Sequence, residues 1–390
     1  MKKINSFVAA VMALCMAAPV LTSCGDDEVV EKEVIKEVIK ENIKSEFSLN
    51  DEMVKEQKAK SGNDVAVLLV AFGSTWDNAF KAFDGTKAAY ENAFKAAGIN
   101  ADVYVCFSSD ICINRASIGE NEDEEGNIVS RDYYEPRYLL HAIGAAKYSK
   151  IYVQSLQVIP GEEFANVVAS VKKFMNNGYI KEAHLDDEYL AKLAEDEAIF
   201  LGMPLLNDPE TDVPEVAKQL NELYKGEAAK GVVAFMGHGN PDTYDTFKAN
   251  IRYTQLEEAL QKFSKNYYVG TVDMPDNYKD QVMERMQENG IKNGEIYLHA
   301  LMSIAGDHAH NDMAGEGEDY QAEGDEWNDN EEVSWFEYFK HNGYTSQVTL
   351  GRNNQPLGLL ELPGVLNVWI QHTLNAEFLE DAYHSMYPEE

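Results

Sequence analysis

From residue 65 onward, short apolar runs alternate with segments whose apolar residues recur at helical spacing. This alternation of strand-like and helix-like patterns is typical of an α/β fold, because a helix returns the chain to the start of the next parallel strand. The pattern predicts strands within 65–74, 101–110 and 151–164, and helices over 77–98 and around 137–147.

The same alternation occurs a second time along the chain. Apolar runs at 232–241, 267–275 and 296–309 follow in the same order. The runs 151–164 and 296–309 share five of fourteen residues at an offset of 145, and the first two pairs of runs align at an offset of 164. Three matches in one order predict an internal duplication. We therefore expect two similar Rossmann-like halves, 61–225 and 226–390, each a parallel sheet flanked by helices and facing a cleft.

The two predicted halves differ where their strands end. The first half has Ser74, Ser109 and Glu163, and the aligned positions of the second half are His238, Asp273 and His308. Ligands of open α/β sheets bind at the carboxyl ends of the strands, and two imidazoles with a carboxylate suit a divalent metal. The alternative is a capping aspartate with two incidental loop histidines, which explains each residue but not their shared placement.

Composition narrows the choice of partners. The formal charge is −34, from 67 acidic and 33 basic residues. Such a surface repels phosphate backbones and attracts cations, so we expect no nucleic-acid partner. Beyond the leader only Cys106 and Cys112 remain. They are expected to be small buried apolar residues, with a disulfide between them as the alternative.

The N-terminus predicts export. Lys2 and Lys3 precede an apolar segment, 7–20, as in a secretory signal. The following LTSC resembles a bacterial lipobox, which implies a lipoprotein signal peptide over 1–23 and lipidation of Cys24. A plain signal peptide with a chance cysteine is the alternative. Residues 24–60 are expected to form an acidic and helical linker, with the protein held by lipid at the periplasmic face of the membrane or at the cell surface.

Four motifs carry a family resemblance between about Val65 and Gly343. They are LLVAFGST, QVIPGEEF (157–164), GHGNP (237–241) and GDHAHNDMAG (306–315), with VGTVDMP as a weaker fifth. With them the chain resembles the anaerobic-type sirohydrochlorin cobaltochelatases of the class II chelatase superfamily, which includes ferrochelatase. The resemblance implies a tetrapyrrole cleft between two α/β halves, with the metal held by His238, Asp273 and His308.

The residue types fit that chemistry. Metal insertion removes two pyrrole protons while a divalent ion is delivered to the ring, and His238 and His308 could bind the ion and accept protons as catalytic groups. We expect Asp307 and Asp312 to orient His308 or to cap the next helix. The full set expected behind the metal or in the substrate cleft is Ser74, Gly237, Asp307, His310 and Asp312. Mid-strand His299 is expected to be packed or hydrogen-bonded.

The chain departs from the family pattern at three places. Asp273 stands where the family usually has glutamate, and Gln157 where it commonly has histidine. The acidic segment 316–332 is expected to be a solvated loop, with a lid over the cleft as the alternative.

The resemblance implies a lyase that inserts Co²⁺, with Fe²⁺ or Ni²⁺ as alternatives, into sirohydrochlorin or a related tetrapyrrole. Export is unexpected for such an enzyme, because cobalamin assembly normally occurs in the cytoplasm. A second hypothesis is therefore a lipoprotein that scavenges haem, a corrinoid or a metal without turnover, in company with an outer-membrane uptake system. The sequence leaves open whether the chain forms a homo-oligomer.

Overall fold

The computed structural model describes residues 45–119, 126–245, 247–315, 333–351 and 354–379. The predicted signal peptide, Cys24, most of the expected linker and the acidic segment 316–332 lie outside these residues. Contacts divide the chain into two compact units, 1–46 and 47–390, and the second unit holds all the sheets and helices discussed below.

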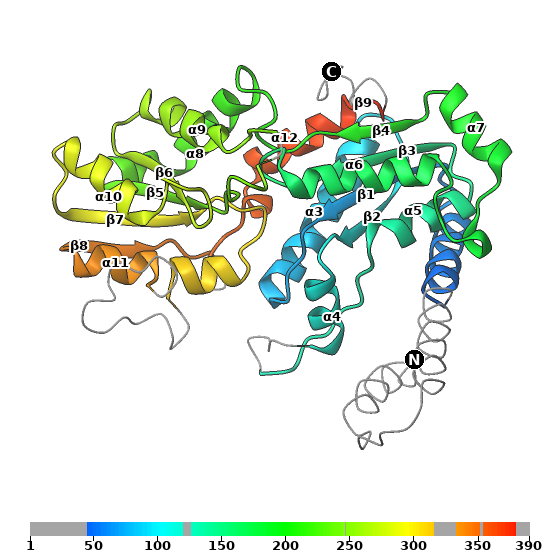
Figure 1. Cartoon of the computed structure of the whole chain (residues 1–390), viewed down its shortest axis with the longest axis horizontal. Helices are drawn as coiled ribbons and strands as arrows, with labels where there is room; N and C mark the ends of the chain where they lie inside the picture. The colour runs from blue at the N-terminus through cyan, green and yellow to red at the C-terminus, as the bar shows by residue number, and fades with distance from the viewer. Residues whose placement is uncertain (1–44, 120–125, 246, 316–332, 352–353, 380–390) are drawn as a thin grey trace, which may run out of the picture. The chain divides into compact units, whose positions relative to one another are not determined.

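The first sheet has the strand order β2-β1-β3-β4-β9 (Figure 1). All its neighbours are parallel except β9, which runs antiparallel to β4. Its strands are β1 (Val65–Ala71), β2 (Ala101–Phe107), β3 (Lys150–Ser155), β4 (Ile199–Gly202) and β9 (Glu377–Phe378). Its helices are α3 (Asp77–Ala96), α4 (Asp110–Ile118), α5 (Pro136–Ala145), α6 (Glu162–Met175), α7 (Asp187–Glu195), α12 (Pro363–Leu374) and the 3₁₀ turn η1 (Lys181–Ala183).

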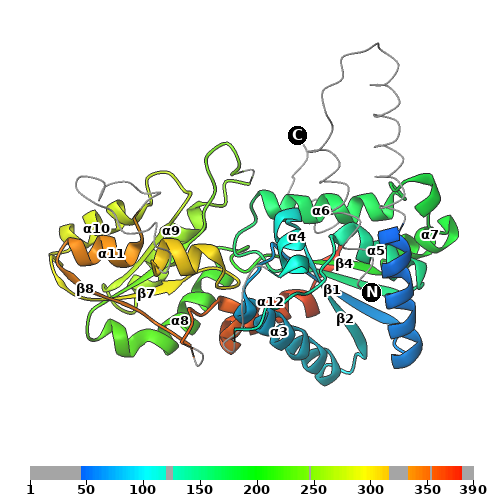
Figure 2. The same cartoon turned by 90° about the horizontal axis from the view of Figure 1, so that it is seen from below.

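The second sheet has the order β6-β5-β7-β8 and is parallel throughout (Figure 1). Its edge strand β8 lies beside β7 in the view from below (Figure 2). Its strands are β5 (Val232–Gly237), β6 (Tyr267–Thr271), β7 (Gly294–Ala300) and β8 (Tyr344–Val348). The associated helices are α8 (Asp212–Ala228), α9 (Ile251–Gln261), α10 (Lys279–Glu288), α11 (Trp335–His341), a π-helical turn η2 (Ala309–Met313) and a 3₁₀ turn η5 (Leu359–Glu361). This order repeats that of β1 to β4, so the predicted α/β fold with an internal duplication is confirmed.

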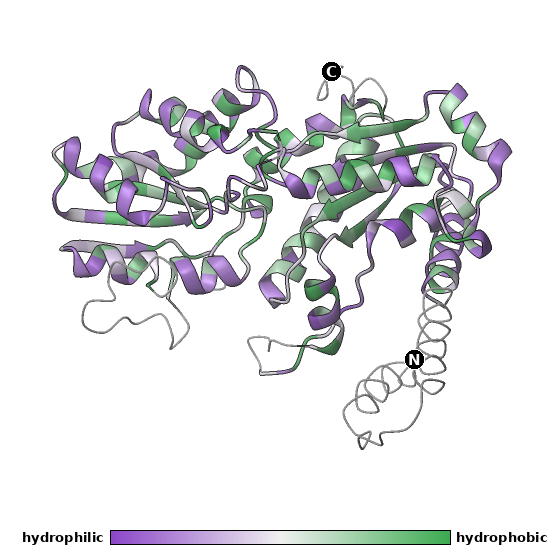
Figure 3. Cartoon of the chain, in the orientation of Figure 1, coloured by the Kyte–Doolittle hydropathy of each residue, from purple (hydrophilic) through white to green (hydrophobic). Residues whose placement is uncertain are grey.

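The central strands of both sheets are buried on their two faces, which is why they are almost continuously apolar. The edge strand β8 is partly exposed and more polar. In β1 every residue after Val65 is buried. Figure 3 shows this as apolar strands between helices that alternate apolar and polar positions. In the second sheet, alternate residues of β5 pack in opposite directions: Val233 and Phe235 join the cluster that contains α8 and α9, whereas Met236 joins that of α10 and α11.

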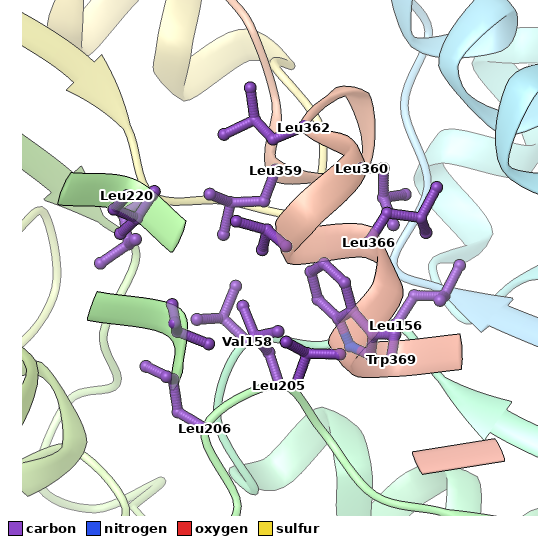
Figure 4. Packing of buried hydrophobic residues seen from close by; sticks show 14 of the residues in the cluster. Leu156, Val158, Leu205, Leu206, Leu220, Leu359, Leu360, Leu362, Leu366 and Trp369 are labelled. Carbon is purple, nitrogen blue, oxygen red and sulfur yellow. The ribbon is translucent and has the colours of Figure 1, made fainter. Parts of the chain in front are cut away.

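The C-terminal segment does not stay with the second half. Helix α12 packs against β3, β4, α3 and α8, and β9 pairs with β4 of the first sheet. Its leucines and the fully buried Trp369 fill the space between the halves (Figure 4). One apolar cluster therefore runs through both halves. Burial of these apolar residues holds 359–379, part of the predicted second half 226–390, against the first sheet.

Two boundaries differ from the prediction. Residues 45–61 are helical, with Val54 buried, and Gln57 Nε2 donates to Asp102 Oδ1 of the first half at 3.1 Å. The first half thus begins before residue 61. The expected boundary at 225/226 falls inside α8, which packs on α9 and β5. Below, the first half means residues 47–206 and the second half 212–351.

Two smaller observations complete the fold. Cys106 is buried and Cys112 is partly buried, and no disulfide joins them. Among the helices that the structure describes, none is both long enough and apolar enough to span a bilayer.

Candidate active site

A cavity of about 560 Å³ lies between the carboxyl ends of the strands of the two halves. Its size is within the usual range for small-molecule and cofactor sites. All six aligned strand-end residues contribute to its wall: Ser74, Ser109, Glu163, His238, Asp273 and His308. The prediction that the two halves face a common cleft is therefore confirmed.

The loop after β5 fixes His238. Gly239 has a φ of +77°, and a Cβ at this position would lie 2.8 Å from the backbone nitrogen of Met274, so the turn requires glycine. His238 Nδ1 lies 2.7 Å from the carbonyl oxygen of Gly239. A carbonyl only accepts, so Nδ1 carries the hydrogen of the neutral ring and Nε2 keeps its lone pair. Nε2 is the atom available to a metal or a proton.

His308 is arranged in the same way. Its Nδ1 lies 2.6 Å from Asp312 Oδ2, one helical turn further on, which again leaves the lone pair on Nε2. The His308 and His238 rings are nearly perpendicular, with centroids 4.8 Å apart. Burial lowers the pKa of His308, but the hydrogen bond to Asp312 and the carboxylates of Asp312, Asp273 and Asp307 outweigh burial, so its pKa is raised. Asp312 thus has the orienting position expected of it.

Asp273 lies close to His238 but on the wrong side of the ring for joint ligation. Its Oδ2 is 3.6 Å from Nδ1 of His238, the nitrogen already used by Gly239. Within the residues that the structure describes, no three His, Cys, Asp or Glu side chains form a ready-made metal site. The predicted set of His238, Asp273 and His308 therefore shares one wall without converging on a single point, because the aspartate side chain is short.

The equivalent residues of the first half serve local structure instead. Ser109 Oγ accepts from the backbone N–H of Cys112 and caps α4. Glu163 accepts a 2.8 Å hydrogen bond from Ser108 Oγ, and Ser74 Oγ accepts from the backbone N–H of Trp76. Ser74 and Ser109 thus have turn and capping roles, whereas Glu163 links the start of α6 to the residue that follows β2.

The motifs of the two halves meet in pairs across the cleft. A Cβ at Gly161 would lie 2.8 Å from Asn240 Nδ2, so the absence of a side chain at Gly161 allows the VIPGEEF and GHGNP loops to touch. A Cβ at Gly306 would lie 3.4 Å from Ser74 Oγ, which places the GDH loop beside the FGST loop. The four motifs, widely separated in sequence, build one site.

Sequence reasoning missed the side walls of the cleft. Phe72, Ile111 and Tyr244 line it and are 49%, 64% and 52% exposed, so they offer apolar surface to a ligand. Arg115 of α4 contributes a guanidinium to the same wall. Phe72 lies within the motif LLVAFGST, and Tyr244 follows the motif GHGNP closely, so the motifs could have indicated both residues. Ile111 and Arg115 carry no motif.

Three of the residues expected in the cleft or behind the metal have other surroundings. Asp307 lines the cleft but does not orient His308; it accepts a hydrogen bond from Trp76 Nε1 of the first half. His310 is buried and stacks on the Trp76 ring, away from the cleft wall. Gly237 does not line the cleft either. It is the last residue of β5 and packs against the ring of Tyr253. Mid-strand His299 is buried and bonds to Glu227, as expected.

Comparison with known proteins agrees with this site. The chain is 26% identical over 226 residues to the sirohydrochlorin cobaltochelatase CbiKC of Nitratidesulfovibrio vulgaris, which covers 58% of this chain and 64% of that protein, less than two thirds of its length. It is 25% identical over 264 residues to the sirohydrochlorin cobaltochelatase of Salmonella typhimurium, covering 67% of this chain and 82% of that protein.

A solved structure, SirB from Bacillus subtilis with Fe³⁺, aligns with 83% of this chain and 98% of its own, at 13% identity and a TM-score of 0.47. The family model described as cobalt chelatase (CbiK) matches residues 65–377, which is most of the chain and includes both halves, the cleft and the returning C-terminal segment. The chain therefore belongs to the cobalt chelatase (CbiK) family.

Proposed function

We propose that this protein is a chelatase that inserts Co²⁺ into sirohydrochlorin or a closely related tetrapyrrole. The observation that carries the proposal is the pair His238 and His308. Both Nδ1 atoms are engaged, so both Nε2 atoms keep a lone pair at one wall of a cleft between the halves. The names of the relatives from Nitratidesulfovibrio vulgaris and Salmonella typhimurium support cobalt and sirohydrochlorin as the substrates.

The reaction exchanges one divalent cation for two pyrrole protons, so the site must deliver a metal and accept protons. Nε2 of His308 can do either, and Asp312 stabilises the imidazolium when that ring takes a proton. The carboxylates of Asp273, Asp307 and Glu163 at the same cleft attract a cation. Asp273 would coordinate the metal only after its side chain turns from Nδ1 of His238, or through a water molecule.

The walls suit the second substrate. Phe72, Ile111 and Tyr244 provide apolar surface for a flat macrocycle, and desolvation of the ring strengthens the electrostatic steps at its centre. Arg115 is placed to receive one of the carboxylates on the rim of the ring. A large apolar ligand with an acidic rim and a basic interior matches these three features.

We further infer that the protein acts outside the cytoplasm, held to the membrane by lipid on Cys24. The support is the sequence alone: a positively charged start, an apolar segment and LTSC before the acidic Gly25-Asp26-Asp27. Replacement of Cys24 by serine should release the protein from the membrane fraction. Retention of that variant on membranes would contradict lipid anchoring.

The same exported location favours a second function, capture of a haem or corrinoid without turnover. Either imidazole of this wall could then serve as an axial ligand to the metal of an intact ligand. This function predicts one bound ligand per chain, whereas a chelatase turns over.

The experiment that separates these functions uses the full chain in mild detergent with sirohydrochlorin and Co²⁺, followed by absorption spectroscopy. A chelatase converts many equivalents of the ring to its metallated form, and His238→Ala with His308→Ala abolishes the conversion. A stoichiometric spectral shift without turnover would support the binding protein. No spectral change in the wild type would contradict both functions.

A further inference from the structure

Trp76 makes two contacts that bracket His308 from across the cleft. Its Nε1 donates a 2.5 Å hydrogen bond to Oδ1 of Asp307, the residue before His308. Its ring stacks on that of His310, two residues after His308, with centroids 3.6 Å apart and planes 1° from parallel. A single side chain of the first half thus holds residues on both sides of a second-half histidine.

Local structure does not account for a tryptophan at this place. Trp76 is the N-cap residue of α3 and makes no side-chain capping bond. Serine, threonine, aspartate or asparagine would stabilise this helix end better, by about 1 kcal/mol. Trp76 is not one of the residues that line the cleft. Part of its surface packs against the main apolar cluster, and its contacts with Asp307 and His310 are made in addition to that packing.

A second element of the first half reaches the same loop. Arg115 of α4 lies 4.0 Å from the other oxygen of Asp307, and both side chains are about half exposed. An exposed pair at this distance adds little stability, but it aims the Asp307 carboxylate at the first half. The GDH loop is therefore fixed on two sides: Asp312 orients the ring within the second half, and Trp76 and Arg115 set the loop's place across the cleft.

We propose that Trp76 is a positioning residue for metal insertion. Its indole holds the loop of His308 against the first half, so that Nε2 of His308 meets the centre of a tetrapyrrole whose position is set by the cleft walls. The inference rests on the proposed chelatase function and deepens it. Small displacements of a reacting group carry a large cost in rate, about 10²-fold for 1 Å.

The test compares Trp76→Ala and Trp76→Phe in the full chain, with steady-state kinetics at varied tetrapyrrole and varied Co²⁺. The alanine variant loses both contacts and should lower kcat by about 10²-fold. The phenylalanine variant keeps the ring that stacks on His310 but not the N–H, and should lie between alanine and wild type. The KM for the tetrapyrrole should change little in both, because Trp76 is not on the wall.

Tyr244→Ala provides the matched control. This residue is an aromatic that does line the cleft, so its loss should raise the KM for the tetrapyrrole more than it lowers kcat. Thermal unfolding of each variant shows whether the fold is retained. A Trp76→Ala variant with wild-type kcat, or one whose tetrapyrrole KM rises as steeply as that of Tyr244→Ala, would overturn the proposal.

Co²⁺ binding without tetrapyrrole separates this inference from the proposed function. The visible absorption of Co²⁺ reports its ligands, and Trp76→Ala should weaken Co²⁺ binding by about 10-fold, as loss of an orienting partner does at other metal sites. If the wild type binds Co²⁺ but does not metallate the tetrapyrrole, the chelatase function is contradicted. The comparison of Co²⁺ affinity between wild type and Trp76→Ala still tests the role of Trp76 in that case. Equal Co²⁺ affinity in the variant, or no Co²⁺ binding by the wild type, would overturn the role.

Discussion

The two halves of this protein have the same strand order, yet their strand ends do different work. In the first half Ser74 and Ser109 hold a turn and a helix end through local hydrogen bonds, and Glu163 accepts a hydrogen bond from Ser108. In the second half His238 and His308 each use one ring nitrogen in a local bond and keep the other nitrogen available. Imidazole has two such atoms, so it can be fixed in place and still react. The duplication supplies the cleft, and in the proposed function the residue types at three positions would supply the chemistry.

The same contrast recurs in the strand interiors. Gln154 of β3 and His299 of β7 are aligned, and both are buried polar residues with side-chain partners. Gln154 accepts from Thr373 and donates to the Met203 carbonyl, whereas His299 bonds to Glu227. Only the histidine can change its charge near neutral pH. The second half is thus expected to be the pH-sensitive one.

The largest effect should follow from placing first-half residues in the second half. His238→Ser with His308→Glu should lower cobalt insertion by at least about 10²-fold, because both imidazoles, which can bind the metal and exchange protons near neutral pH, are removed. Initial rates from absorption spectra measure this. The matched control, Ser74→Ala with Ser109→Ala, removes only a turn and a capping hydrogen bond and should stay close to wild type. An equal loss in the control would mean that both halves carry the chemistry.

The next largest effect should come from replacing Asp312. Its hydrogen bond to His308 has no counterpart at the aligned residue of the first half, Glu163. The raised pKa of His308 means that its ring is protonated, and unable to bind metal, up to a pH above its usual 6.5. The rate should therefore fall as the pH drops through that raised pKa. Asp312→Asn removes the charge that raises it, so the acid limb of the pH–rate profile should move to lower pH. If the acid limb of the Asp312→Asn profile stays at the wild-type pH, a group other than His308 determines that limb.

A smaller effect is expected from replacing Asp273 with glutamate, the residue that the family usually has at this position. Asp273→Glu adds one methylene, which lets a carboxylate reach past Nδ1 of His238 toward the metal. The KM for Co²⁺ should fall several-fold, while the KM for the tetrapyrrole stays the same. Asp273→Asn is the control for charge and should raise the KM for Co²⁺. If Asp273→Glu weakens Co²⁺ binding instead, the shorter side chain is the adapted one.

The smallest effect concerns stability rather than rate. Burial lowers the pKa of His299 below 6.5, against the opposing effect of Glu227. As the pH falls below 6.5, the unfolded chain takes up a proton before the folded one, so this residue costs stability on the acid side and nothing at higher pH. His299→Gln, which copies Gln154, should flatten the dependence of Tm on pH between about 5 and 7. If the slope of Tm against pH is the same in His299→Gln and wild type, other residues cause the loss of stability at acid pH.

Much of the site was predictable because it depends on short-range patterns. Each strand is an apolar run, and parallel topology places every strand's carboxyl end at the same edge of its sheet, so His238, Asp273 and His308 could be assigned to one rim from the chain's pattern alone. Their aligned partners in the first half followed from the repeat. Mid-strand His299 followed from its position in an apolar run.

Other features were out of reach because they depend on contacts between distant segments. The hydrogen bond from Trp76 to Asp307 joins residues 231 positions apart, and nothing near either residue indicates it. Asp307 was expected to orient His308 because the two are adjacent in sequence. The return of α12 and β9 to the first sheet was missed for the same reason, since an apolar helix does not reveal which of two open faces it will cover.

The sequence by itself determined the α/β fold, its duplication and the residues at the rim, since period and spacing are properties of a local chain. The tertiary structure alone decided which ring nitrogens remain available, where Asp273 points and what holds the His308 loop in place. Those outcomes follow from packing two halves around one shared core, where a side chain's partner is set by distance in space rather than by distance along the chain.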